Sequence, residues 1–318
     1  MSLFPVKVAA KSREAEDIAS FELRRPDGEP LPAFSAGAHI DVQAGEGLVR
    51  QYSLCNDPAE RHRYVIGVLR EAVSRGGSAA LHDQVAEGDI LHVSEPRNLF
   101  PLACGEHALL LAGGIGVTPI LCMAEQLERD GKDFAMHYCT RSPSRTAFRA
   151  RIAASRFAGK VHFHFDDGPP GQKLALDQAL ARCAPGTHLY VCGPAGFIQH
   201  ALDSARAAGW PGERLHSEYF TAAPQDASGD QAFSVKIAST GQVIAVAPGQ
   251  PVTAALAEHG IDIPVSCEQG ICGTCITGII DGIPDHRDMY FNDMERERND
   301  QFTPCCSRSK GRMLVLDL

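Results

Sequence analysis

This sequence lacks the features that would place it in a membrane or on nucleic acid. No apolar run in its 318 residues approaches the roughly 18 that a membrane helix requires, and the longest, Ala108–Ala112, has the length of a strand. Basic residues are in the minority, with 30 Lys and Arg against 39 Asp and Glu, and they form no cluster that would bind phosphates. We therefore expect neither a membrane nor a nucleic acid among the partners.

The sequence also shows no secretion signal, although it contains eleven cysteines. Disulfides persist in oxidising compartments, and a chain of this length does not need them to stabilise a small core. We expect a cytoplasmic, reducing location with free thiols.

Four of the cysteines have the spacing of an iron–sulfur site. The pattern C-x4-C-x2-C, followed after 29 residues by one more cysteine, is the plant-type arrangement that binds a 2Fe–2S cluster, here through Cys267, Cys272, Cys275 and Cys305. Gly270 and Gly273 suit such a loop, because glycine adopts positive φ cheaply and the loop must point amide groups at sulfur. A structural zinc site is the alternative, but zinc sites usually show two C-x2-C pairs and this segment has one.

Spacing alone does not identify the fourth ligand, because Cys305 and Cys306 are adjacent. We take Cys305. The cysteines outside the cluster set and the motifs below are interpreted as small buried hydrophobic residues: Cys55, Cys104, Cys122, Cys139, Cys183 and Cys306.

Hydrophobic patterning predicts a multidomain chain. Residues 1–103 show short alternating runs separated by turns, which indicates an antiparallel β-barrel. In residues 104–222 apolar strands alternate with helical stretches, which indicates an α/β domain with a parallel, doubly wound sheet. Residues 223–231 are small and polar and are interpreted as a linker. Residues 232–318 combine a hairpin, a helical stretch at 252–259 and the cysteine loop, the layout of a β-grasp ferredoxin domain.

Two motifs in the barrel segment suit a cofactor that has a phosphate and a flat ring. The first begins a strand and consists of Arg50, Tyr52 and Ser53. A guanidinium binds phosphate bidentately, and an aromatic face suits a flat ring. The second follows Arg75 at the head of a helical stretch and consists of Gly76, Gly77 and Ser78. These residues would present amide groups and a hydroxyl to a phosphate, and a helix cap at Ser78 without a ligand is the alternative.

Two further motifs in the α/β segment suit a dinucleotide. The first follows an apolar strand and consists of Gly113, Gly114 and Gly116, with Thr118 as the expected N-cap and Pro119 at the first helical position. Glycines there let a pyrophosphate approach the backbone at the positive end of a helix. The second ends the last central strand, at the carboxyl edge where ligands bind in such sheets, and consists of Cys192, Gly193 and Pro194.

The order of barrel, nucleotide domain and C-terminal plant-type ferredoxin resembles the phthalate dioxygenase reductase family, which includes the reductase components of vanillate O-demethylase. The resemblance covers nearly the whole chain and rests on four motifs in the expected order. It implies that NADH gives two electrons to a flavin, FMN rather than FAD, and that the flavin passes them singly to the 2Fe–2S cluster. It does not determine whether Arg141 selects for or against the 2′-phosphate that distinguishes NADPH from NADH.

The resemblance also implies roles for individual residues at the flavin. Arg50 would pair with the flavin phosphate, Tyr52 would pack on the isoalloxazine ring, and Ser53 would hydrogen-bond the polar edge of that ring. Phe220 would cover the flavin until nicotinamide displaces it.

The implied nicotinamide site lies in the α/β domain. Cys192 would lie beside the nicotinamide and Glu218 near the hydride path, so that Ser53, Cys192 and Glu218 form the expected catalytic set. Thr140 and Arg141 follow the second strand of this domain, where the nucleotide should lie.

The final electron acceptor is expected outside the chain. No Cys-x-His pair marks a Rieske centre, and no His-rich stretch suggests a two-His-one-carboxylate iron site. The resemblance implies a separate Rieske-type oxygenase that acts on an aromatic or related compound. Residues 232–318 carry seven Lys and Arg against eleven Asp and Glu, a surplus that could steer a basic partner or merely keep the surface soluble.

Two alternatives remain open on the sequence. Reductases of a cytochrome P450 or a diiron oxygenase share these modules, although most place the ferredoxin first. A redox sensor is a different class, and it predicts negligible turnover with NADH and artificial acceptors.

Overall fold

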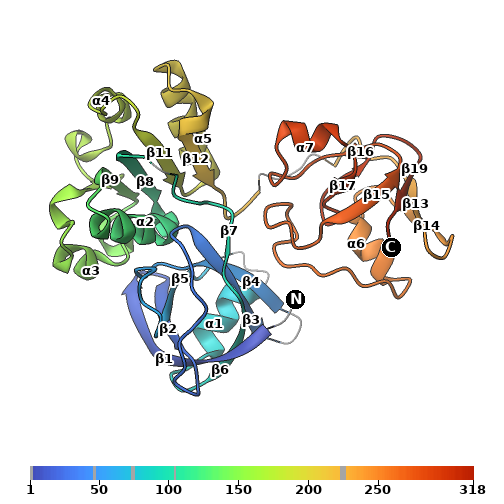
Figure 1. Cartoon of the computed structure of the whole chain (residues 1–318), viewed down its shortest axis with the longest axis horizontal. Coiled ribbons are helices and arrows are strands. Elements are labelled where there is room, and N and C mark those ends of the chain that lie inside the picture. The colour runs from blue at the N-terminus through green and yellow to red at the C-terminus, as the bar shows by residue number, and fades with distance from the viewer. Residues whose placement is uncertain (1–2, 46–47, 73–75, 104, 223–226) are drawn as a thin grey trace. The chain divides into compact units, whose positions relative to one another are not determined.

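The computed structural model describes residues 3–45, 48–72, 76–103, 105–222 and 227–318. It divides into two compact units, Met1–Phe220 and Thr221–Leu318, and each is described by itself (Figure 1).

The N-terminal part of the first unit is an antiparallel barrel, as predicted. Its sheet has the order β4-β3-β6-β1-β2-β5, β7 pairs with β3, and a bridge between Leu54 and Ile66 joins the two ends. The elements are β1 (Leu3–Ala15), β2 (Ile18–Arg24), β3 (Ala38–Gly45), β4 (Leu48–Ser53), β5 (Tyr64–Leu69), α1 (Gly77–Gln84), β6 (Ile90–Ser94) and β7 (Arg97–Asn98).

Alternation of side chains along these strands fills the barrel. Val6 and Val8, and likewise Ile40 and Val42, are two residues apart and buried, because successive side chains in a strand point to opposite faces. Leu81 of α1 joins the same core. Burying an aliphatic side chain of this size contributes about 1.5–3 kcal/mol.

The second half of this unit is the predicted parallel α/β sheet, with strand order β10-β9-β8-β11-β12. Its strands are β8 (His107–Gly113), β9 (Asp133–Thr140), β10 (Val161–Phe165), β11 (His188–Cys192) and β12 (Leu215–Glu218). Its helices are α2 (Val117–Arg129), α3 (Arg149–Ala154), α4 (Leu176–Ala181) and α5 (Ala195–Ala207). The direction of strand addition reverses between β8 and β11, and ligands bind beyond the carboxyl ends of strands at such a switch point.

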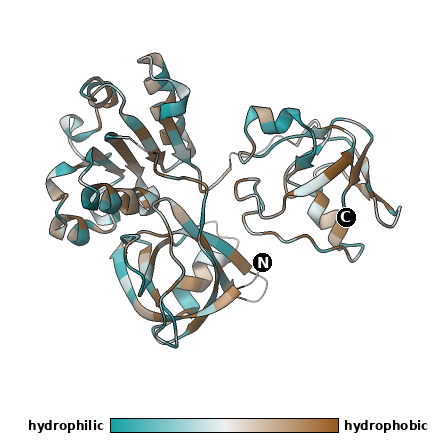
Figure 2. Cartoon of the chain, viewed as in Figure 1, coloured by the Kyte–Doolittle hydropathy of each residue, from teal (hydrophilic) through white to brown (hydrophobic). Residues whose placement is uncertain are grey.

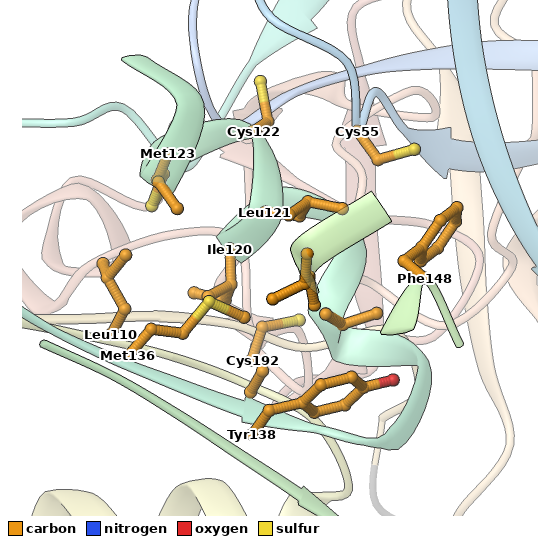
Figure 3. Close-up of a cluster of buried hydrophobic side chains, with 14 of the residues drawn as sticks. Cys55, Leu110, Ile120, Leu121, Cys122, Met123, Met136, Tyr138, Phe148 and Cys192 are labelled. Carbon is orange, nitrogen blue, oxygen red and sulfur yellow. The ribbon is translucent and has the colours of Figure 1, made fainter. Parts of the chain in front are cut away.

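Apolar side chains cover both faces of this sheet. One face packs Leu110 and Met136 against Ile120 and Leu121 of α2, as Figure 3 shows. The other face packs Leu111 and neighbouring strand residues against α4 and α5. In Figure 2 the helices carry teal on part of their surface, whereas the central strands are coloured towards brown. Strands covered on both faces in this way produce the nearly continuous apolar runs in the sequence.

The second unit is the predicted β-grasp domain. Its sheet has the order β14-β13-β19-β15-β17, in which β13 pairs antiparallel with β14 and parallel with β19. Its elements are β13 (Phe233–Ile237), β14 (Val243–Val246), α6 (Val252–Ala257), β15 (Thr277–Asp281), β16 (Pro284–Asp285), α7 (Asp293–Glu297), β17 (Gln301–Phe302), β18 (Arg308–Ser309) and β19 (Met313–Leu316). Val252 and Leu256 bury one face of α6 against this sheet.

The described end of the predicted linker is anchored in the second unit. Asp230 is almost fully buried and forms ion pairs with Arg287 at 2.8 Å and Arg308 at 3.3 Å. Residues 223–226 lie outside the described residues, and the proposed domain boundaries remain predictions.

The interpretation of the remaining cysteines as buried is right for two of them. Cys55 and Cys122 are fully buried, and Figure 3 shows both thiols in the apolar cluster beside α2. The prediction is wrong for Cys139, Cys183 and Cys306, which are partly exposed. Cys139 lies on the less covered face of β9, with Ala135 and His137, and Cys183 follows the end of α4. Cys104 lies outside the described residues.

Candidate functional site

The four cysteines of the spacing pattern lie together in the second unit. Cys267 interacts with Cys272 and Cys305, and Cys305 also interacts with Cys275. Hydrogen bonds from Cys272 and Cys305 lower the pKa of Cys267, and the same bonds raise the pKa of Cys272 and Cys305, so the thiols share protons as one group. A thiolate is the form of cysteine that ligates metal.

The loop points backbone amides at these sulfurs. Gln269 and Ile271 each donate an N–H to Sγ of Cys267 at 3.4 Å. Thr274 donates in the same way to Sγ of Cys272 at 3.4 Å. Amide donors of this kind tune the potential of an iron–sulfur cluster.

Two glycines make this loop possible. Gly270 has φ +72° and Gly273 has φ +68°, both in the left-handed region that favours glycine. A Cβ on Gly270 would overlap the Cys306 thiol, and a Cβ on Gly273 would overlap the Tyr290 ring. Any other residue at either position would force the loop away from Cys306 or from Tyr290.

The two adjacent cysteines contact each other but differ in their other neighbours. Cys305 is buried against Cys267 and Cys275. The thiol of Cys306 instead lies 3.3 Å from Oγ1 of Thr303 and 3.8 Å from Oγ of Ser307. This arrangement favours Cys305 as the fourth ligand.

The order of the ligands separates this loop from a structural zinc site. Structural zinc sites usually combine two C-x2-C pairs, whereas a plant-type 2Fe–2S cluster takes three cysteines from one loop and the fourth from elsewhere. Cys267, Cys272 and Cys275 share the loop and Cys305 comes from a distant segment.

The barrel motif forms a cradle at the start of α1. Gly76 occupies the N-cap position with φ +94°. A Cβ on Gly77 would lie 2.5 Å from Cγ of Arg50, so the absent side chain leaves room for this arginine. Ser78 accepts a hydrogen bond from the N–H of Glu71 at 3.2 Å. The guanidinium of Arg50 and the first turn of α1 therefore lie together, as a phosphate site requires. Arg75 lies outside the described residues.

Ser53 connects the barrel to the parallel sheet. Its hydroxyl donates to Oε2 of Glu218 at 3.2 Å, and Glu218 lies opposite Cys192 in the register of β12 and β11. Burial raises the pKa of Glu218 to about 8. Burial, together with the nearby Glu218, also raises the pKa of the Cys192 thiol. Tyr52 is half-buried beside the barrel core, and burial raises the pKa of its phenol.

The two glycine motifs of the α/β domain pack backbone against backbone. A Cβ on Gly193 would lie 2.8 Å from Cα of Gly113, and a Cβ on Gly116 would overlap the Cys192 carbonyl. A Cβ on Gly113 would lie 2.9 Å from Cδ of Pro194. Gly114 has φ +54°. The two turns thus meet at the switch point between β8 and β11, where a dinucleotide can approach the main chain.

The predicted helix start after this turn was wrong. Gly116 occupies the capping position and α2 begins at Val117, so Thr118 and Pro119 lie in its first turn. The Thr118 hydroxyl donates to the carbonyl of Ile115 at 3.1 Å. The reason is that a 3-10 turn at Gly114–Gly116 runs directly into the helix, which leaves no extended capping residue.

The remaining predicted residues occupy the carboxyl edge or the end of the first unit. Oγ1 of Thr140 lies 2.7 Å from Oγ1 of Thr146 and donates to the carbonyl of Ser142 at 3.2 Å. Arg141 is exposed at the end of β9. Phe220, the last residue of the unit, is 40% exposed. The structure therefore brings Ser53, Cys192 and Glu218 together and leaves Thr140 engaged within its own turn.

Two polar residues that the sequence analysis missed lie beside Ser53. His39 of β3 is paired with Ser53 and with Arg97 of β7. Nε2 of His39 and Nε of Arg97 are buried without a hydrogen-bond partner among the described residues. Such orphaned groups fit a site that receives a polar cofactor. The only signal in the sequence was the alternation of His39 and Asp41 with apolar residues, which equally indicates an ordinary strand.

The fold and site define a modular iron–sulfur reductase: a barrel in which Arg50 packs against the start of α1, a nucleotide-type α/β sheet and a cysteine-loop ferredoxin domain. Residues 235–310 match the family described as the 2Fe-2S iron-sulfur cluster binding domain. Residues 94–215 match the family described as the N-terminal domain of dimethylamine monooxygenase subunit DmmA-like proteins.

Relatives extend the match to the whole chain. Vanillate O-demethylase oxidoreductase from Pseudomonas sp. (strain HR199 / DSM 7063) is 54% identical over 317 residues, which cover 99% of this chain and 100% of that protein. Phthalate dioxygenase reductase, described as a modular structure for electron transfer from pyridine nucleotides to 2Fe–2S, is 39% identical with a TM-score of 0.77 and covers 100% of this chain and 98% of that one. An intact type IV self-sufficient cytochrome P450 monooxygenase is 37% identical with a TM-score of 0.86, covering 99% of this chain but 41% of that one.

The chain belongs to the phthalate dioxygenase reductase family of oxidoreductases, which includes the vanillate O-demethylase oxidoreductases. Among the described residues, no helix combines the length and the apolar character needed to cross a membrane.

Proposed function

We propose that this protein is the NADH-dependent reductase component of a two-component oxygenase, and that it passes electrons through FMN and a 2Fe–2S cluster to a separate Rieske-type oxygenase acting on an aromatic or related compound. The observation that carries the proposal is the hydrogen bond from Ser53 to Glu218. It joins the barrel motif to the carboxyl edge of the nucleotide-type sheet, so a flavin ring and a nicotinamide ring would meet there. We retain the proposed division at 1–103, 104–222, 223–231 and 232–318.

The barrel residues would bind and orient the flavin. Arg50 and the amides at Gly76, Gly77 and Ser78 would hold its phosphate, because a guanidinium and a helix N-terminus both favour an anion. Tyr52 would pack against the ring, and Ser53 would hold its polar edge. Bound FMN would supply the conversion of a two-electron hydride into single electrons.

Residues of the α/β domain would place the nicotinamide. The glycine turns at Gly113, Gly114 and Gly116, and at Gly193 with Pro194, would admit the pyrophosphate to the main chain. Cys192 would lie beside the nicotinamide, and Phe220 would shield the flavin from water until that ring arrives. Thr140 and Arg141 would border the nucleotide at the end of β9.

Glu218 would hold a proton at the junction of the two sites. Because burial raises its pKa to about 8, the carboxyl is mostly neutral at neutral pH. A neutral carboxyl adds no negative charge next to a flavin that is about to receive a hydride.

Docking of the oxygenase would be transient. Electron-transfer encounters use small interfaces, and the acidic surplus of residues 232–318 could steer a basic partner. The match to a self-sufficient cytochrome P450 monooxygenase makes a P450 the second candidate for the acceptor.

An anaerobic NADH titration followed by absorption spectroscopy tests the proposal. We expect the flavin and cluster bands to bleach together and FMN to be released on denaturation. A flavin that bleaches while the cluster band stays would overturn the proposed electron order. No response to NADH would favour the redox sensor.

A further inference from the structure

A row of three polar side chains crosses the barrel at β7, β3 and β4. His39 is paired with Arg97 on one side and with Ser53 on the other. Directly paired residues in antiparallel strands project from the same face, with Cβ atoms about 5 Å apart. Ile40 and Val42 point into the barrel core, so the row occupies the opposite face of β3.

The short strand β7 is fixed against β3, which makes the row rigid. Gly37 has φ +90°, and a Cβ there would overlap the carbonyl of Phe100. Asn98 donates from Nδ2 to the carbonyl of Ala36 at 2.9 Å, and its Oδ1 accepts the N–H of Phe100 at 2.9 Å. These contacts tie Asn98 of β7 to the turn that precedes β3 and to the segment that follows β7.

Two nitrogens in the row have no partner among the described residues. His39 is 4% exposed and its Nε2 is unpaired, as is the buried Nε of Arg97. Nη2 of Arg97 is occupied, since it donates to Oδ2 of Asp41 at 2.6 Å, and Gln51 donates to the other carboxylate oxygen at 3.0 Å. Buried polar groups in folded proteins are nearly always paired, so two adjacent orphans indicate a partner that is not part of the chain.

The protonation state of His39 defines what that partner can be. Burial, with Arg97 adding to it, lowers the pKa of His39 to about 4. The imidazole is therefore neutral at neutral pH, and Nε2 can donate or accept one hydrogen bond. Nε of Arg97 can only donate.

We propose that His39 and Arg97 are positioning residues of the flavin site, where they bond the polar edge of the isoalloxazine ring beside Ser53. This inference rests on the proposed function, because it requires flavin at Ser53. One edge of an isoalloxazine carries carbonyl oxygens and ring nitrogens and the other carries methyl groups. Two unpaired nitrogens, on residues that the sheet register puts in one row with Ser53, match the polar edge, and groups at that edge tune the electronics of the flavin.

The test compares His39→Leu with His39→Gln, which keeps a hydrogen-bonding side chain. His92→Leu is the matched control, because His92 is exposed on β6 of the same barrel. The full-length holoprotein is stripped of flavin and titrated with FMN, and the midpoint potential of the bound flavin is then measured. We expect His39→Leu to bind FMN about 3- to 10-fold more weakly, the effect of one uncharged hydrogen bond, and to shift the potential. His39→Gln should recover most of the affinity, and His92→Leu should match the wild type.

Unchanged FMN affinity and potential in His39→Leu would overturn the inference, and a lower melting temperature of the flavin-free variant would then assign His39 a purely structural role. If His39→Leu does not fold, Arg97→Gln decides, because glutamine can still donate to Asp41. Wild-type affinity and potential in that variant would overturn the inference, whereas weaker FMN binding would support it. A wild-type protein that binds no flavin would instead refute the proposed function itself.

Discussion

Ser53 and Glu218 are 165 residues apart in the sequence and are joined by a hydrogen bond of 3.2 Å. Ser53 ends strand β4 of the barrel, and Glu218 ends strand β12 of the parallel sheet. Cys192 lies opposite Glu218 in the adjacent strand. The bond therefore lies where the proposed flavin and nicotinamide sites meet, and it makes Glu218 the natural target for a first variant.

Replacing Glu218 by Gln should remove a pH dependence from flavin reduction. Burial raises the pKa of Glu218 to about 8, so the carboxyl becomes charged as the pH rises through that value. Because the charge opposes transfer of a hydride to the flavin, we expect the wild-type rate constant to fall between about pH 7 and 9. Stopped-flow reduction by NADH should show this fall in the wild type and a flat profile in Glu218→Gln. The same fall in the variant would assign the ionisation to another group.

The same ionisation should affect stability. The folded state holds the Glu218 proton more tightly than the unfolded chain, so its stabilising contribution is present at low pH and is lost as the pH rises from the ordinary carboxyl range through about 8. The free energy of unfolding, measured with urea at about pH 6 and pH 9, should therefore fall more between these pH values in the wild type than in Glu218→Gln. Equal losses would show that the carboxyl is well solvated.

Replacing each of the adjacent cysteines by Ala should separate their roles. Cys305 lies against Cys267 and Cys275, whereas the Cys306 thiol lies against Thr303. We expect Cys305→Ala to lose the iron and the visible cluster bands, and Cys306→Ala to keep both. Iron analysis of the two purified variants measures this directly. A Cys306→Ala protein without iron, beside a loaded Cys305→Ala protein, would reverse the assignment.

Replacing Cys272 by Ser should separate the two halves of the electron path. Cytochrome c reduction should be abolished, because it needs the cluster, while NADH-to-ferricyanide activity should persist through the flavin. Cys183→Ser is a matched control, since Cys183 lies outside the cysteine loop and its thiol donates to the carbonyl of Ala179. Loss of both activities in Cys272→Ser would count against the order of flavin before cluster.

Replacing Gly116 by Ala should destabilise the α/β domain. The new Cβ would overlap the carbonyl of Cys192, and two main chains cannot separate without moving both turns. We expect the free energy of unfolding, measured with urea, to fall by about 1–3 kcal/mol, and NADH binding to weaken. Gly196→Ala is the control, because a Cβ there meets nothing within 4 Å and alanine favours a helix. Equal stability of the two variants would show that the turns yield easily.

Several features could be predicted from the sequence because they depend on neighbouring residues. The cysteine spacing predicted the 2Fe–2S loop, since three of its ligands come from one short segment. The alternating and continuous apolar runs predicted the antiparallel barrel and the parallel sheet, because side-chain period and burial follow from strand type. The N-cap at Thr118 failed because the 3-10 turn at Gly114–Gly116 changed the entry to α2.

Other features depend on which strands are adjacent. His39 and Arg97 were not predicted, because Arg97 comes beside His39 only through the pairing of β7 with the β3–β4 hairpin, and these segments are far apart in the sequence. The preference for Cys305 over Cys306 likewise follows from the packing of Cys306 against Thr303.

The sequence alone determined the order of the three modules, the cluster loop and the glycine turns, because each is encoded by local spacing and by conformations that glycine adopts cheaply. Only the tertiary structure decided that Ser53 bonds Glu218 opposite Cys192, and that Nε2 of His39, paired with Ser53 in the sheet register, has no hydrogen-bond partner among the described residues. The pKa of Glu218 is also a tertiary property, since it depends on burial by segments that fold from distant parts of the chain.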